Sequence, residues 1–195
     1  LRLAVELAER AAVPAILGRA WINLAVYLRM TGLLGEAEAL YRETIRLAAR
    51  IGERRLAAAS LTNLANALVD ARRNEEAAAL YTDSIAGAEE CGDRGIEALA
   101  LGGMARVLAL MGRHEEAEPC YDRGLALARE IGDRWTEAVM IGNRAELYRL
   151  LGRYTLSERE QTRALEAHRA AGNPRFIPFV LETRAQLYCD TGRVA

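Results

Sequence analysis

The chain has 195 residues, of which 51% are hydrophobic and 27% are charged, a balance typical of a folded domain rather than a disordered segment. Its formal net charge is -1, and all 26 basic residues counted in that charge are arginine. Because nucleic acids and anionic membranes attract proteins through accumulated positive charge, this near-neutral balance argues against direct binding to either.

Two small residue types recur along the chain at intervals of forty. A sustained period of about 20 to 50 residues is typical of stacked supersecondary units that contact only their neighbours. We therefore predict an all-α solenoid that forms a single domain over residues 1–195. The recurring positions are Ala25, Ala65, Ala105, Ala145 and Ala185, followed seven residues later by Gly32, Gly112, Gly152 and Gly192.

The order of the repeating units follows from this phase. Leu1 and Val5 are in phase with Tyr41 and Ile45, so residues 1–13 are expected to form the second helix of a preceding unit. Because the chain also stops within a unit, we expect a fragment of a longer protein, or ends that pair with another chain. The full units are predicted at 15–54, 55–94, 95–134 and 135–174, and residues 175–191 are predicted to form the first helix of a following unit.

Each full unit is predicted to contain two amphipathic helices joined by a turn. In the first unit, Trp21, Leu24 and Ala25 are spaced so that they share one helix face, which we expect to be buried. Gly32 can take the left-handed conformation that ends a helix. The second helices pair a small with a large residue, namely Ala37 with Tyr41, Ala77 with Tyr81 and Ala117 with Tyr121, whereas the fourth unit has Ser157 and Gln161.

This alternation of large and small residues resembles the tetratricopeptide repeat (TPR). The period of forty exceeds the usual 34 or so residues, and is similar to the long repeats of bacterial signalling ATPases, of transcription regulators, and of the Pins/LGN and kinesin light chain adaptors. The resemblance implies a right-handed α-α superhelix of about ten antiparallel helices. It rests on Trp21, Leu24, Ala25, Leu28, Gly32, Ala37, Tyr41, Thr44 and Ile45 and on their equivalents in later units.

The resemblance also implies a concave groove lined by the first helix of each unit. Asparagine recurs there at one phase, and its amide can both donate to and accept from the backbone of an extended ligand. Arginines on the same stripe can pair with ligand carboxylates. Alternatively, the asparagines bond only to neighbouring helices or to water. The candidate groove residues are Arg19, Asn23, Asn63, Asn66, Arg106, Asn143 and Glu146.

No arrangement of residues predicts catalysis or a metal site. His114 and His168 are the only histidines, and the chain has no HExxH motif and no nucleophile elbow. Gly102 and Gly103 fall within a predicted helix and lack the lysine of a phosphate-binding loop. We expect these two glycines to permit close packing or a local kink.

Four other side chains interrupt the regular pattern. Cys91, Cys120 and Cys189 are too far apart in sequence to indicate a metal site or a disulfide framework, so we expect them to be buried as small apolar residues. Arg144 occupies a phase that is elsewhere apolar. We expect it to reach the edge of its helix or to pair with a nearby acid such as Glu146.

Together these features predict a protein-protein or peptide interaction module. We interpret it as the sensing or scaffold segment of a larger bacterial regulatory protein in the cytoplasm, with a protein or peptide ligand and with no enzyme activity, cofactor, metal, nucleic-acid partner or membrane partner. One alternative is a structural scaffold that forms homo-oligomers through its open ends. Another is the domain of a transcription regulator that binds a small-molecule inducer.

Overall fold

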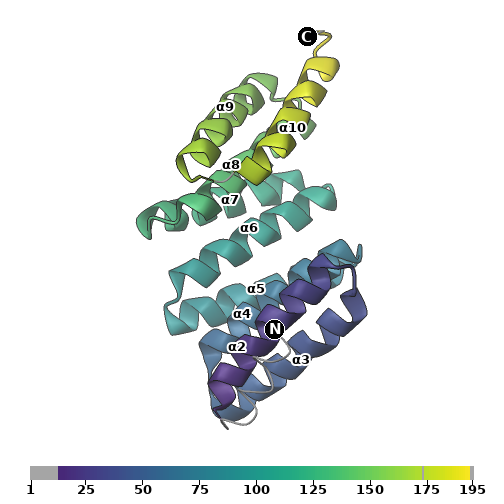
Figure 1. Cartoon of the computed structure of the whole chain (residues 1–195). Coiled ribbons are helices and arrows are strands. Elements are labelled where there is room, and N and C mark those ends of the chain that lie inside the picture. The colour runs from purple at the N-terminus through teal and green to yellow at the C-terminus, as the bar shows by residue number, and fades with distance from the viewer. Residues whose placement is uncertain (1–12, 173, 194–195) are drawn as a thin grey trace.

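The computed structural model describes residues 13–172 and 174–193, and this part of the chain is an array of helices (Figure 1). The helix predicted over residues 1–13 lies outside the described residues, except for Val13, which precedes the first described helix. The described helices are α2 (Pro14–Met30), α3 (Leu34–Ile51), α4 (Arg54–Asp70), α5 (Asn74–Cys91), α6 (Arg94–Leu110), α7 (His114–Glu130), α8 (Arg134–Leu150), α9 (Tyr154–Ala170), the short 3-10 helix η1 (Pro174–Phe176) and α10 (Ile177–Asp190).

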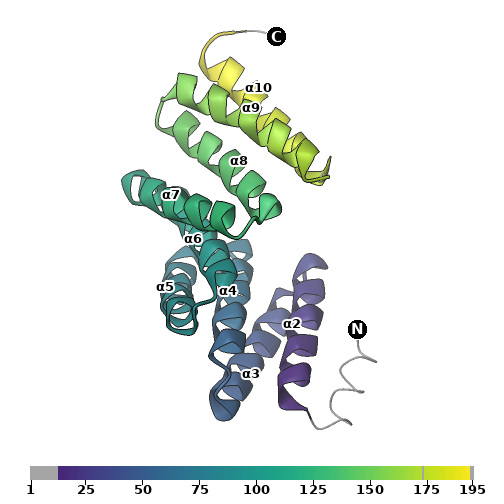
Figure 2. The ribbon, with the colours of Figure 1, turned by 90° about the vertical axis from the view of Figure 1, so that its left-hand side faces the viewer.

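Consecutive helices pack against each other along the whole described array, with α2 and α3 at one end and α9 and α10 at the other (Figure 1). A view at right angles shows that α8, α9 and α10 run in a different direction from α4 and α5 (Figure 2). The stack therefore twists as it proceeds. The described residues contain no strand, and the predicted all-α solenoid is confirmed.

The alternation of small and large residues is the basis of the packing. The recurring alanine is completely buried in α2, α4, α6 and α8, and the tyrosines of α3, α5 and α7 are at most 1% exposed. A methyl group at these crossings lets two helix backbones approach closely, and the tyrosine ring fills the space beside them. The prediction for these positions is confirmed, except that Ala185 of α10 is exposed.

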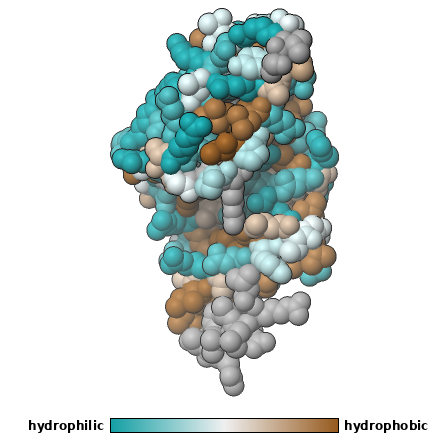
Figure 3. Space-filling model, turned by 45° about the horizontal axis from the view of Figure 1, so that its top comes forward, coloured by the Kyte–Doolittle hydropathy of each residue, from teal (hydrophilic) through white to brown (hydrophobic). Residues whose placement is uncertain are grey.

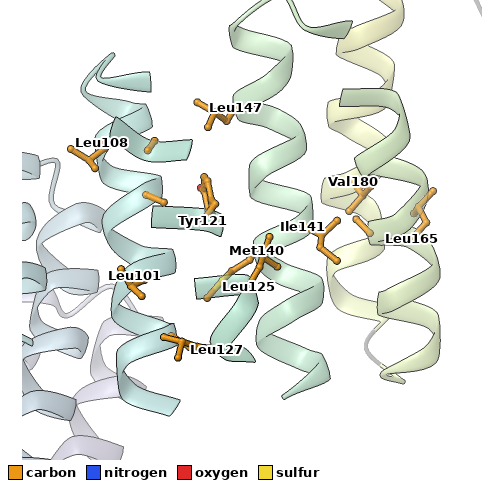
Figure 4. Packing of buried hydrophobic residues seen from close by; sticks show 14 residues of the cluster. Leu101, Leu108, Tyr121, Leu125, Leu127, Met140, Ile141, Leu147, Leu165 and Val180 are labelled. Atoms are coloured by element: carbon orange, nitrogen blue, oxygen red, sulfur yellow. The ribbon is translucent and has the colours of Figure 1, made fainter. Parts of the chain in front are cut away.

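A buried apolar cluster joins α6 to α10 (Figure 4). Tyr121 and Leu125 of α7 lie between the two neighbouring first helices, and Met140 and Ile141 extend from α8. A Cβ atom on Gly102 would lie 2.8 Å from Cε of Met140, so a side chain at this position of α6 would require the flexible end of Met140 to move. The expectation that this glycine permits close packing is confirmed.

The turns between helices share one backbone geometry. Seven glycines in these turns and Gly192, which follows α10, have positive φ, and Arg72 is the one other described residue that does, with φ of 63°. Two of the helices that follow a turn are capped, because Asp93 accepts a hydrogen bond from the backbone N–H of Ile96 and Asp133 accepts one from that of Thr136. These caps satisfy N–H groups that the helix itself leaves unbonded.

The fourth unit has a more polar interior than the units before it. Glu160 of α9 is completely buried and accepts a hydrogen bond from Nη2 of Arg144 at 2.6 Å. Nη1 of Arg144 donates to Asp122 of α7, also at 2.6 Å. The expectation that Arg144 pairs with a nearby acid is confirmed, but Glu146 as the example is wrong, since the partners come from the neighbouring helices α7 and α9 rather than from its own.

The expectation of buried cysteines is also wrong. Cys91 and Cys189 are exposed and Cys120 is half-buried. Cys91 is the last residue of α5, and Cys189 is the last but one of α10. At these helix ends the side chains project toward solvent rather than into the next crossing.

Candidate binding groove

A cavity of about 760 Å³ lies along the first helices of successive units. Most of its lining comes from α4, α6 and α8, and it extends to Arg29 of α2, Phe176 of η1 and Phe179 of α10. The volume falls within the range of roughly 300 to 1,000 Å³ that is typical of ligand sites. The face shown in Figure 3 has separate apolar patches among hydrophilic areas.

One end of the groove is polar and is held by hydrogen bonds between helices. Oδ1 of Asn66 accepts from the hydroxyl of Tyr81 at 2.8 Å and from Nη2 of Arg106 at 3.3 Å. Burial raises the pKa of Tyr81 more than the charge of Arg106 lowers it, so the hydroxyl stays protonated and donates. Beside this bond, Nη1 of Arg29 donates to Oδ2 of Asp70 at 2.6 Å.

A glycine in α6 makes room for this arrangement. A Cβ atom on Gly103 would lie 2.4 Å from the ring of Tyr81, which is fully buried under α6. Since real Cβ atoms do not approach a ring so closely, any other residue at this position would displace Tyr81 and break its bond to Asn66. This glycine therefore positions the polar end of the groove.

The other end of the groove is apolar and unusually exposed. Leu99 of α6, Trp135 of α8 and Phe179 of α10 are 42%, 46% and 39% exposed, although each is large and apolar. The Trp135 ring meets Phe176 edge to face, with centroids 6.0 Å apart, and Phe176 stacks on His168 at 5.5 Å. These contacts hold the aromatic side chains in place at the cavity wall.

Four of the seven candidate groove residues line this cavity, namely Asn63, Asn66, Arg106 and Asn143. Arg19 and Asn23 are exposed on α2 and do not line it, because only the C-terminal part of α2 reaches the cavity. Glu146 also does not line it, since its carboxylate accepts two hydrogen bonds from Arg149, at 2.7 and 2.9 Å.

Several lining residues lie outside the stripe that helical spacing identifies. Ile96, Thr136 and Phe176 line the cavity and share one phase of the forty-residue period, one turn before the stripe. This shared phase is the signal in the sequence that could have identified these three residues as part of the groove. Trp135 has no such signal, because the equivalent positions carry alanine, arginine or glycine.

The tetratricopeptide repeat profile matches residues 17–90 and again 96–170 of this sequence. The chain belongs to the tetratricopeptide repeat family. The resemblance drawn from the alternation of large and small residues is thereby confirmed, together with the right-handed superhelical fold. TPR arrays are interaction scaffolds, and the groove described above lies on the first helices of this one.

Solved structures with the same fold include BtubC (BKLC) from P. vanneervenii, at 21% identity and a TM-score of 0.83, with 98% of this chain and 82% of that chain covered. A Rap protein complexed with competence and sporulation factor has 13% identity and a TM-score of 0.81 over 97% of this chain and 53% of its own. A signal transduction ATPase from Pyrococcus horikoshii, with a TPR sensor, has 18% identity and a TM-score of 0.76 over 95% and 29%. A search of curated protein sequences finds no match.

None of the described helices combines the length and the apolar character required to cross a membrane. The described residues also contain no group of three or more histidine, cysteine or acidic side chains that could hold a metal ion.

Proposed function

We propose that this TPR chain binds an extended peptide segment of a partner protein along the groove on α4, α6 and α8. The observation that carries the proposal is the composition of this groove, in which hydrogen-bonding side chains and exposed apolar side chains face the same cavity. An extended peptide presents both backbone N–H and C=O groups and side chains, so it needs both kinds of partner.

Two of the three asparagines that line the groove have unused hydrogen-bonding capacity. Nδ2 of Asn63 donates to the carbonyl oxygen of Ala59 at 2.9 Å, which leaves its Oδ1 and one N–H group available. Asn143, two units further along, makes no side-chain hydrogen bond to any described residue. Such amides can bind the backbone of a peptide that passes from α4 to α8.

The comparisons support a role as the sensing segment of a larger bacterial regulatory protein. The Rap protein was solved with a bound factor, and the ATPase has a TPR segment described as its sensor. This chain spans about half of that Rap chain and less than a third of that ATPase chain. In our proposal the groove likewise takes up the ligand, and other parts of the protein respond to it.

The proposal is tested by selecting ligands from a displayed library of random peptides on the immobilised protein. Enriched peptides are then measured against the Asn63→Ala, Asn143→Ala double variant, for which we expect loss of binding with little change in thermal melting. Asn23→Ala is the matched control, because Asn23 has the same repeat phase but lies outside the cavity. Enriched peptides that bind the double variant as well as the wild type would contradict the proposal.

A second candidate function is self-association through α10. Leu181 of this helix is 49% exposed and Ala185 is exposed, whereas the equivalent residues of α8, Ile141 and Ala145, are buried. A second copy packed on this face would cover them. Light scattering over a wide range of concentrations tests this candidate, and Leu181→Asn should abolish any increase in mass. A constant monomer mass at all concentrations would rule it out.

A further inference from the structure

The groove contains a positive charge that no carboxylate of the described residues neutralises. Two arginines line the cavity, and Arg29 is paired with Asp70. Arg106 donates only to the neutral amide oxygen of Asn66, at 3.3 Å, and has no ion pair with any described residue. Two cations and one carboxylate leave this end of the groove with one net positive charge.

The surroundings of Arg106 fix where that charge lies. Oδ1 of Asn66 accepts hydrogen bonds from both the hydroxyl of Tyr81 and Nη2 of Arg106. The guanidinium is therefore held against α4, and the amide that holds it is itself held by α5. The bond to Asn66 uses one of five N–H donors. The remaining donors are available to a carboxylate in the cavity, and this group takes two parallel N–H bonds from a guanidinium.

The apolar end of the groove lies at a fixed distance from this charge. Leu99 and Arg106 are both on α6 and are seven residues apart, which corresponds to about 10 Å along the helix axis. Trp135 and Phe179 extend the apolar end onto α8 and α10. An extended peptide covers about 10 Å in roughly three residues, so a peptide that also crosses from α4 toward α8 needs at least that many residues between the two ends.

Given the groove binding proposed above, on which this inference rests, we propose that the ligand is a peptide with an aspartate or glutamate at least three residues from a large apolar side chain. The acid pairs with Arg106, and the apolar side chain packs between Leu99, Trp135 and Phe179. The acid belongs to a side chain rather than to a C-terminus, because Arg106 lies on the middle helix, with Asn63 and Asn143 on either side to bind a continuous backbone.

The inference is tested with the enriched peptides, synthesised with an acetylated N-terminus and an amidated C-terminus. We expect them to share an acid and a large apolar residue at this spacing. Replacing the acid by its amide should raise the Kd about tenfold to a hundredfold, the usual effect of losing a charged hydrogen-bonded pair. Arg106→Gln should erase that difference, and Arg106→Lys should retain part of it.

The controls separate this inference from the proposed function. Arg19→Gln removes an exposed arginine outside the cavity and should leave the difference between acid and amide peptides unchanged. Peptides that need Asn63 and Asn143 but bind equally as acid and amide would overturn the inference and leave the proposed function standing. Binding that requires a free C-terminus, with the internal acid dispensable, would also overturn it. Binding that is indifferent to all groove variants would overturn both.

Discussion

At the scale of single residues, the turn between α4 and α5 contains an unfavourable backbone conformation. Arg72 has φ of 63°, the left-handed value that glycine provides in the equivalent turns. In this conformation the contact of Cβ with the backbone destabilises an L-residue by roughly 1 to 2 kcal/mol, and glycine removes this contact. The greater flexibility of unfolded glycine offsets part of the stability gained in this way. We therefore expect Arg72→Gly to increase the free energy of unfolding by about 1 kcal/mol.

Urea denaturation of the wild type and the variant measures this change. Gly112→Arg is the reverse substitution at the equivalent turn between α6 and α7, where φ is 76°. It should destabilise by a similar amount. A lower unfolding midpoint for Arg72→Gly would show that the arginine side chain contributes more than the backbone conformation loses.

The candidate site shows which residue contacts the sequence can predict. Spacing within each helix placed Asn63 and Asn66 of α4 and Arg106 of α6 on the groove-facing stripe, and all three line the cavity. The same spacing gave no indication that Asn66 accepts from Tyr81, because that contact depends on how closely α4 and α5 approach. Contacts between helices are set by the packing of the array, which one helix does not encode.

At the scale of the helix, α9 differs from α5 and α7 in the polar groups that it buries. His168 is 1% exposed, its Nδ1 has no hydrogen-bond partner, and burial lowers its pKa from the ordinary value of 6.5. A lowered pKa means that the folded protein binds this proton less readily than the unfolded chain does. The stability contributed by neutral His168 is therefore present above about pH 6.5 and is lost as the pH falls below it.

Glu160 on the same helix acts in the same direction at lower pH. Burial alone would raise its pKa, but the hydrogen bonds and charges of Arg144 and Arg163 outweigh burial and lower the pKa below its usual range. Its ion pairs are present while the carboxylate is charged and are lost as the pH falls through the lowered pKa. Acid should therefore destabilise the fold around α9 first through His168 and, at lower pH, through Glu160.

We accordingly expect the wild type to become less stable between pH 7.5 and 5.5, and His168→Leu to remove most of this loss. The measurement is the urea unfolding midpoint at both pH values. His114→Asn, which removes the other histidine, should keep the pH dependence of the wild type. If His168→Leu keeps it too, another group is responsible for the loss.

At the scale of the whole molecule, the period of the sequence predicts the fold well because the same close crossing recurs in every unit. Ala65 and Ala105 are buried in the same way, and Tyr81 and Tyr121 fill the same space beside them. The cavity is less predictable, because its position depends on the twist accumulated over several units. Asn23 has the phase of Asn63, yet it lies outside the cavity.

A second periodic feature connects neighbouring units on the surface of the array. An arginine in the turn that follows a first helix pairs with a glutamate 35 residues earlier, in the preceding second helix. The pairs are Arg73 with Glu38 at 2.9 Å, Arg153 with Glu118 at 2.7 Å and Arg193 with Glu158 at 3.1 Å. In a solenoid, stability depends on such contacts between neighbours.

One pair is missing from this series. Arg113 is at the equivalent position but bonds only to Glu116, because residue 78 is an alanine. Arg73 bonds both to Glu76 of its own helix and to Glu38, so the geometry permits both partners at once. Ala78→Glu should complete the series and raise the free energy of unfolding by about 0.2 to 1 kcal/mol, the range of exposed ion pairs.

This gain should shrink in high salt, because screening weakens an exposed pair. Urea denaturation at low and high ionic strength measures the difference, and Ala79→Glu adds the same charge at a neighbouring exposed position without the phase of the series. An equal change in both variants would mean that net charge, rather than the pair with Arg113, is responsible. A gain specific to Ala78→Glu would instead show that coupling between adjacent units limits the stability of the array at α5 and α7, the helices that flank the polar end of the groove.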